Sequence, residues 1–323
     1  MNKRLAIWKL IKTSIQNQIP VTLLYVLESS GSSPGRQGFF MAVTAKGDME
    51  GSIGGGIMEH RFVEMAKTKI TQEQSSSVRK QIHNKTSGKN NSGMICSGEQ
   101  TVFLYLLKPE DMIAIESIIS TLEANVHGTL ILSSEGLRFD EDVLGNDFEF
   151  IMHSEIDWFY KEKIGYKNLL TIIGGGHCSL AFSKLMSQMD FYIKVYDKRK
   201  DLKTMLENHT AHEKHVLTDY TELTHLISEQ PNHYVVIMTF GFRTDDIALR
   251  ALLNKEFRYL GLLGSVAKIQ KMFDDYKKEN IDEKWLQRIF TPVGIPIKSH
   301  TPEEIAISIA AEIIREKNKC LDI

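Results

Sequence analysis

The chain has 323 residues, of which 42% are hydrophobic and 25% charged, and it carries a net charge of −2. This length suggests about two domains, and the near-neutral charge gives no indication of a nucleic-acid partner. No apolar stretch reaches the roughly 20 residues of a membrane-spanning helix, and three dispersed cysteines do not form a disulfide framework, so we expect a cytoplasmic protein without a membrane partner.

The first third of the chain predicts an N-terminal α+β domain over residues 1–107. Apolar residues at helical spacing and runs of β-type residues identify its elements, while polar runs identify its loops. The predicted helices are 3–17 and 57–70, the strands are 21–27, 39–44 and 101–107, and the loops are 72–77 and 86–93.

Residues 108–167 form a predicted connecting region. It contains a helix over 111–122 and strands over 128–132 and 148–152, whereas the acidic and aromatic stretch 156–163 is interpreted as a linker or a covering segment.

From residue 168 to residue 323 the pattern alternates between strand and helix. Such alternation is typical of a parallel sheet, so we expect a Rossmann-like C-terminal domain and an α/β protein overall. The predicted strands are 169–173, 191–196, 234–239 and 258–263, and Thr301 with Pro302 begins the last helix.

A glycine turn follows the first of these strands and reads Gly174-x-Gly176-x-x-Ser179, with Asp197 at the end of the next strand, 23 residues after Gly174. Glycines at these places permit a tight turn and a close approach to a pyrophosphate, and an acid about 20 residues later accepts hydrogen bonds from a ribose. The same turn also occurs in Rossmann scaffolds that bind another ligand or none.

Two residues beside this turn have open interpretations. His177 either caps the turn or contacts a ligand. Cys178 either packs helix against strand or, at a helix N-terminus, has a lowered thiol pKa.

A second glycine cluster, Gly54, Gly55 and Gly56, precedes the helix that carries Glu59. Free backbone amides at a helix N-terminus favour an anion, and Arg36 on the preceding loop is a candidate guanidinium for it. The alternative is that these glycines only allow a sharp turn.

Sulfur and metal chemistry have fewer candidates. Cys96 lies on a glycine-bearing loop. Its thiol either takes part in sulfur or metal chemistry or is buried where the next strand begins. His209, His212 and His215 have helical spacing, but we expect a solvated helix-to-loop region there, and no zinc spacing is present.

The ordered set of motifs resembles the XdhC/CoxI family, the accessory proteins of xanthine dehydrogenases and related molybdenum hydroxylases. The resemblance covers about residues 1–107 and 168–317 and rests on both glycine clusters and on Ser33-Pro34, Tyr259–Ser265, Pro292–Ile295 and Thr301–Ile314. The chain departs from the family pattern at Ser97, at Cys178-Ser179, at Phe240-Gly241 and at Val266, so the resemblance is stronger in the N-terminal half.

This resemblance implies a cytoplasmic, homodimeric chaperone in purine catabolism that binds molybdenum cofactor (molybdopterin). The protein would assist the sulfuration of the cofactor together with a cysteine desulfurase and deliver it to apo-xanthine dehydrogenase. We expect both glycine loops to face the cofactor, with Cys96 receiving or relaying sulfur and no metal bound by the chain itself.

Two alternatives to this function stay open. The chain is a subunit of the dehydrogenase or another oxidoreductase that uses NAD(P) through Asp197, or it is an interaction module whose Rossmann half binds nothing. Pterin or nicotinamide dinucleotide released from the purified protein would separate these cases.

Overall fold

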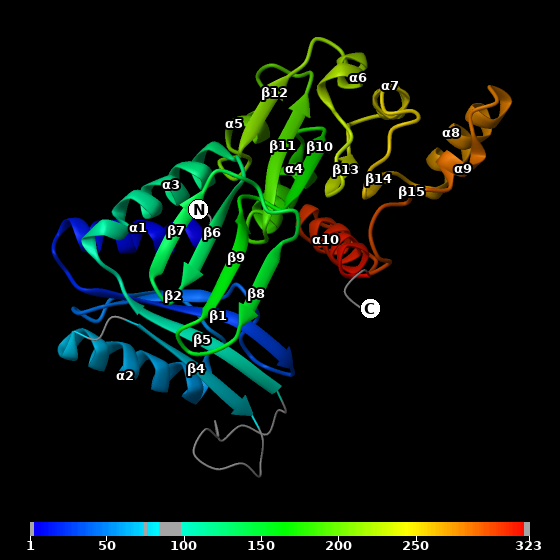
Figure 1. The fold of residues 1–323 in the computed structure, drawn as a ribbon. Helices are drawn as coiled ribbons and strands as arrows, with labels where there is room; N and C mark the ends of the chain where they lie inside the picture. The colour runs from blue at the N-terminus through cyan, green and yellow to red at the C-terminus, as the bar shows by residue number, and fades with distance from the viewer. Residues whose placement is uncertain (1–2, 74–75, 84–97, 320–323) are drawn as a thin grey trace. The chain divides into compact units, whose positions relative to one another are not determined.

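The computed structural model describes residues 3–73, 76–83 and 98–319. The chain forms two compact units, Met1–Gly165 and Tyr166–Ile323 (Figure 1). The first unit contains antiparallel sheets and the second a parallel sheet, which confirms the predicted fold class.

The first sheet of the first unit has five antiparallel strands in the order β3-β2-β1-β5-β4. Alternate residues of β1 face opposite sides of the sheet, so Tyr25 joins the core beneath α1 while Leu24 joins the core beneath α2. The elements are α1 (Lys3–Gln16), β1 (Val21–Gly31), β2 (Phe40–Thr44), β3 (Met49–Gly51), α2 (Gly56–Gln72), β4 (Ser76–His83) and β5 (Gly98–Leu106). Strand β4 was not predicted, because its Ser-rich beginning has the composition of a loop.

The segment that the sequence presents as a connecting region packs in this first unit. It forms a second antiparallel sheet, in the order β7-β6-β9-β8, and shares its core with α1 and β1. The elements are α3 (Met112–Ala124), β6 (Gly128–Ser133), β7 (Gly136–Asp140), β8 (Phe148–Met152) and β9 (Trp158–Ile164).

The interpretation of residues 156–163 as a linker or covering segment was wrong. Strand β9 lies between β6 and β8, and its residues 158, 160, 162 and 164 are buried in strict alternation. One of the four is Glu162, and a carboxylate at an inward position hides the strand period in the sequence.

The second unit is built on a six-stranded parallel sheet in the order β12-β11-β10-β13-β14-β15. Helices α4 and α10 contribute to one hydrophobic core of this unit, and helices α7 and α8 contribute to a second core. The elements are β10 (Asn168–Ile173), α4 (His177–Met186), β11 (Phe191–Asp197), α5 (Lys203–Leu206), β12 (Glu213–Val216), α6 (Leu223–Leu226), β13 (His233–Ile237), α7 (Phe242–Arg250), β14 (Tyr259–Leu262), α8 (Val266–Lys278), α9 (Glu283–Leu286), β15 (Ile289–Phe290) and α10 (Pro302–Asn318).

The order of the strands reverses at β10. The chain goes from β10 to β11 and β12 on one side and then returns to β13 on the other side (Figure 1). In open parallel sheets, ligands bind at such a switch point, outside the carboxyl ends of the strands. The turns after β10 and β13 therefore form the candidate ligand-binding edge of this sheet.

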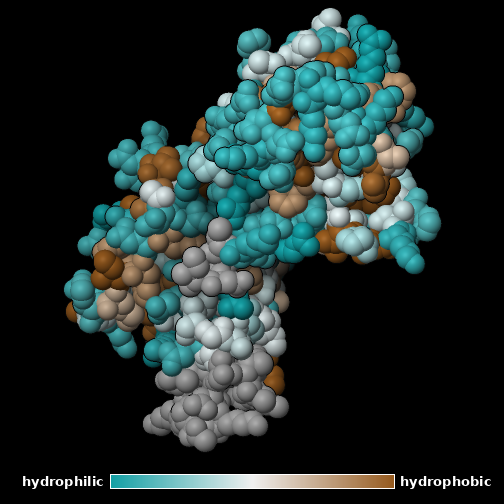
Figure 2. Space-filling model, turned by 90° about the vertical axis from the view of Figure 1, so that its right-hand side faces the viewer, coloured by the Kyte–Doolittle hydropathy of each residue, from teal (hydrophilic) through white to brown (hydrophobic). Residues whose placement is uncertain are grey.

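The surface carries scattered hydrophobic residues among hydrophilic ones on the face that Figure 2 shows. None of the described helices combines the length and the apolar character that a bilayer crossing requires.

A buried carboxylate joins the two sheets of the first unit. Glu162 of β9 is fully buried, and its Oε2 accepts hydrogen bonds from the Tyr25 hydroxyl at 2.5 Å and the Tyr160 hydroxyl at 2.9 Å. Its Oε1 lies 2.6 Å from Nη1 of Arg4 on α1. One carboxylate thus connects α1, β1 and β9.

Glu162→Gln should lower the free energy of unfolding of this unit by about 3 kcal/mol, because Arg4 would lose the buried carboxylate that balances its charge. Glu116→Gln is the matched control, since Glu116 also pairs with a cation of α1, Lys12, at 2.8 Å, but its side chain is 50% exposed. The control should cost less than about 1 kcal/mol. Urea unfolding followed by tryptophan fluorescence measures both, and equal effects would contradict the role given to Glu162.

Candidate functional site

The glycine loop of the first unit is held against a neighbouring loop. Gly54, Gly55 and Gly56 have φ values of 126°, 74° and 71°. A Cβ on Gly54 would lie 2.4 Å from the backbone nitrogen of Gly35, whereas a Cβ on Gly55 would meet nothing within 4 Å. Gly54 therefore permits the close contact of the two loops, and Gly55 lies in open space.

The amides of this loop bind a carboxylate of the same chain. Oε2 of Glu59 accepts hydrogen bonds from the Ser52 hydroxyl at 2.6 Å, the Ile53 amide at 2.8 Å and the Gly55 amide at 3.0 Å. Burial raises the pKa of Glu59, but these hydrogen bonds outweigh it, and the net pKa lies below its ordinary value. The loop is thus an anion site whose anion is Glu59.

Of the other two candidate residues in this unit, Arg36 is described by the structure and Cys96 is not. Arg36 is exposed on the loop that contacts Gly54, and its Nη1 donates to the carbonyl oxygen of Gly31 at 3.2 Å. Cys96 lies outside the described residues.

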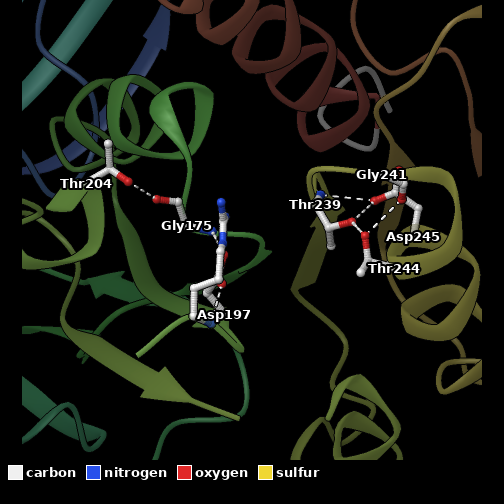
Figure 3. A network of polar contacts seen from close by, with 8 residues as sticks. Gly175, Asp197, Thr204, Thr239, Gly241, Thr244 and Asp245 are labelled. Atoms are coloured by element: carbon white, nitrogen blue, oxygen red, sulfur yellow. Dashed lines mark hydrogen bonds and ion pairs between the residues drawn. The ribbon is translucent and has the colours of Figure 1, made fainter. Parts of the chain in front are cut away.

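The glycine turn of the second unit packs directly on the neighbouring strand. Gly174 has a φ of 111°, and a Cβ there would lie 2.4 Å from the carbonyl oxygen of Met238, just after β13. The Gly175 carbonyl oxygen accepts a hydrogen bond of 2.5 Å from the Thr204 hydroxyl (Figure 3). Gly176 is the N-cap of α4, and a Cβ there would meet nothing within 4 Å. The turn is closed toward the sheet and open at Gly176.

Asp197 lies beneath this turn rather than on the surface. It is fully buried; Oδ2 accepts from the Gly175 amide at 2.7 Å and from Nη2 of Arg199 at 2.7 Å. Oδ1 accepts from Nε of Arg199 at 2.9 Å and from its amide at 2.8 Å. Burial raises the pKa of Asp197, but these hydrogen bonds hold the net pKa below its usual value. Its predicted ribose contact stays a prediction, and its observed partners belong to the chain.

The residues after Gly176 divide between surface and core. His177 is exposed at the start of α4. Cys178 is half-buried, and burial and the nearby Glu303 carboxylate raise the pKa of its thiol, which favours the packing role over the alternative of a lowered thiol pKa.

Sequence reasoning missed a polar network after β13. The Asp245 carboxylate is fully buried and pairs with the Lys268 ammonium. Its Oδ1 accepts from the Thr239 amide at 3.0 Å and from the Thr239 hydroxyl at 2.5 Å (Figure 3). An acid in the first turn of an expected helix was its only sequence signal.

Of the three spaced histidines, His209 is exposed in the loop after α5 and His212 is exposed just before β12, which confirms the expected helix-to-loop region for these two. His215 is on strand β12 and contacts Glu213 at 2.7 Å, while His212 accepts a hydrogen bond from the Ile193 amide at 2.9 Å. The described residues contain no group of three metal-binding side chains.

The Glu59 contacts predict a pH-dependent stability. Because the folded-state pKa is lowered, the charged form stabilises the protein above the unfolded pKa of about 4.5, and this contribution disappears as pH falls through the folded pKa. Glu59→Gln should therefore be less stable than the parent at neutral pH and approach it as the pH falls below the folded-state pKa of Glu59. Parallel loss of stability in both proteins would contradict this reading.

The geometry of the glycine turn in the second unit predicts that an alanine substitution is much more destabilising at Gly174 than at Gly176. Gly174→Ala places a Cβ against the Met238 carbonyl at a positive φ and should cost more than about 3 kcal/mol. Gly176 has a φ of −73°, and a Cβ there would enter open space, so Gly176→Ala should change the free energy of unfolding by no more than about 1 kcal/mol. Thermal unfolding of both variants measures the contrast; similar melting temperatures would refute it.

The amino-acid sequence is similar to those of two known bacterial proteins. The chain is 24% identical to the Escherichia coli K12 protein YqeB over 306 residues, which is 94% of this chain and 44% of YqeB. It is 26% identical over 161 residues to a Bacillus subtilis protein named as a probable subunit of xanthine dehydrogenase, and the match covers 49% of this chain and 46% of that protein. The matched regions thus span less than half the length of these two relatives.

A crystal structure from Bacillus halodurans, described as a xanthine dehydrogenase, has the same fold. Its TM-score is 0.73 at 23% identity, with 98% of this chain and 96% of that chain covered. The family model described as XdhC and CoxI family matches residues 14–80, and the model described as XdhC Rossmann domain matches residues 170–313. Because the two matches follow one another along the chain and together cover more than half of it, the protein belongs to the XdhC and CoxI family.

Proposed function

We propose that the protein is an accessory protein of xanthine dehydrogenase or a related molybdenum hydroxylase. It would bind molybdenum cofactor and assist the sulfuration and insertion of that cofactor. The observation that carries the proposal is the presence of both family domains, in order, in one chain. The name of the Bacillus subtilis relative supports the link to xanthine dehydrogenase.

The described residues offer an anion site that suits a cofactor phosphate. The Ile53 and Gly55 amides already coordinate the Glu59 carboxylate, which stands in for a phosphate oxygen. A phosphate would replace this carboxylate, and Arg36 on the adjacent loop would add a positive charge. When bound, the cofactor would supply the molybdenum centre of the partner enzyme, and this chain would hold and orient it.

The partners follow from the same proposal. A cysteine desulfurase would provide sulfur, Cys96 would receive it, and apo-xanthine dehydrogenase would accept the loaded cofactor from a homodimer of this chain. In this role the protein acts in maturation, in the cytoplasm and in purine catabolism, rather than as a catalytic subunit.

A second candidate is an oxidoreductase, or a dehydrogenase subunit, that uses NAD(P). The glycine turn at the switch point of the parallel sheet favours it, since dinucleotides bind Rossmann sheets at that place. Gly174, Gly176 and His177 would then face the dinucleotide.

Gly55→Ala tests the first proposal. A Cβ at Gly55 meets no atom, but its φ of 74° with ψ of −176° belongs to glycine, so the variant should fold with a distorted amide array. We expect less pterin to be released after acid oxidation of the purified variant, and less activation of apo-dehydrogenase. Gly47→Ala is the matched control, because Gly47 also has a positive φ, of 90°, and open space, but lies in the β2–β3 turn.

Two outcomes would overturn the proposal. One is a parent protein that releases no pterin and does not activate the apo-dehydrogenase. The other is equal loss in both glycine variants. Cys96→Ser separates sulfuration from binding, since it should retain the pterin and still lower activation; full activation would remove Cys96 from the mechanism.

A further inference from the structure

The acid expected to contact a ribose is not available at the surface of the second unit. All of the hydrogen bonds to Asp197 come from Gly175 and Arg199, and the residue is fully buried. A ribose hydroxyl would have to displace a charge-assisted bond to reach it. The group that faces outward at the end of β11 is therefore not the carboxylate.

Cations occupy that place instead. Lys198, Arg199 and Lys200 follow Asp197 directly and Asp201 comes next, so residues 197–201 carry three positive charges and two negative charges. Lys198 and Lys200 are exposed, and the Arg199 side chain is 38% exposed although it is fixed by two hydrogen bonds to Asp197. Asp197 thus orients a guanidinium at the carboxyl edge of the sheet, and Lys198 and Lys200 flank Arg199 along the chain.

An aromatic ring lies across the switch point from these cations. Phe240 follows β13 and is 81% exposed, and the Arg199 Cζ lies 5.7 Å from its ring centroid. Arg199 therefore reaches from the end of β11 toward the turn after β13, on the side of the sheet where Gly176 leaves open space. Figure 3 shows Asp197 and Gly175 on one side of this edge and Thr239 and Gly241 on the other.

Each of these features matches one part of a nucleotide. An exposed aromatic ring with an adjacent guanidinium stacks on a base. Cations beside the end of the second strand accommodate a phosphate on the ribose, whereas an outward acid would accept its hydroxyl. A phosphomonoester carries roughly two negative charges at neutral pH, which suits three clustered cations.

We propose that the carboxyl edge of the parallel sheet binds a nucleotide whose ribose carries a phosphomonoester. Lys198, Arg199 and Lys200 hold that phosphate, and Phe240 stacks on the base. Asp197 is a positioning residue that fixes the guanidinium of Arg199. This inference deepens the second candidate function, the use of NAD(P) at the same glycine turn, and it does not rest on the molybdenum-cofactor proposal, because its ligand includes no pterin.

Binding to the full chain tests the inference with two ligand pairs. NADP⁺ and NAD⁺ differ by a 2′-phosphate on the adenosine ribose, and coenzyme A and dephospho-coenzyme A differ by a 3′-phosphate. Titration calorimetry should give an affinity at least about tenfold higher for the phosphorylated member of one pair. The pair that shows the difference identifies the position of the phosphate.

The double variant Lys198→Ala, Lys200→Ala should remove that preference without changing the affinity of the ligand that lacks the phosphate. Both side chains are exposed, so the variant should fold, whereas Arg199→Ala would leave Asp197 buried without its cation. The double variant Lys277→Ala, Lys278→Ala, in the last turn of α8, removes the same two charges from exposed positions and should keep the preference.

Three results would overturn the inference: no binding of any of the four ligands, equal binding within both pairs, or a preference that survives in the double variant. Phe240→Leu tests the stacking separately and should weaken both members of the preferred pair by a similar factor. An unchanged affinity in that variant would remove Phe240 from the site.

Discussion

The second unit depends on one buried carboxylate. Asp197 closes β11, and its oxygens bind the Gly175 amide of the neighbouring turn and the Arg199 side chain. A buried charge persists only when its hydrogen bonds are satisfied, and here the turn supplies one of the donors. The conformation of the glycine turn, the direction of Arg199 and the end of β11 are therefore set together.

In the first unit a carboxylate also accepts hydrogen bonds from a glycine loop, but it is less deeply buried. Glu59 also satisfies amides of a glycine loop, but it is only partly buried, whereas Asp197 has no exposed surface. Water can solvate Glu59 when it leaves the loop, so an incoming anion competes mainly with its hydrogen bonds. The removal of Asp197 would leave Arg199 without its partner. One carboxylate is thus exchangeable and the other is structural.

The sequence was sufficient for the architecture and insufficient for these contacts. Strand–helix alternation after residue 168 and the glycine turn at Gly174 are local patterns, and the structure confirms the parallel sheet that they predict. Strand β9 was missed because Glu162 occupies a core position that a pattern of apolar residues does not anticipate. Asp197 is at the predicted strand end, but its direction depends on Arg199 two residues later. Only tertiary packing decides between an acid that faces a ligand and one that faces the turn.

The network around Asp245 shows how far this dependence extends along the sheet. Asp245 lies fully buried in the first turn of α7 and fixes the Thr239 amide after β13, as Asp197 fixes the Gly175 amide after β10. Lys268 of α8 neutralises Asp245, as Arg199 neutralises Asp197. The two turns that meet at the switch point are therefore each held by a carboxylate below and a cation beside it. Because both carboxylates are consumed in positioning backbone, the residues that this edge exposes include Lys198, Lys200 and Phe240 beside the Arg199 guanidinium, a surface suited to anions rather than to hydroxyl donors.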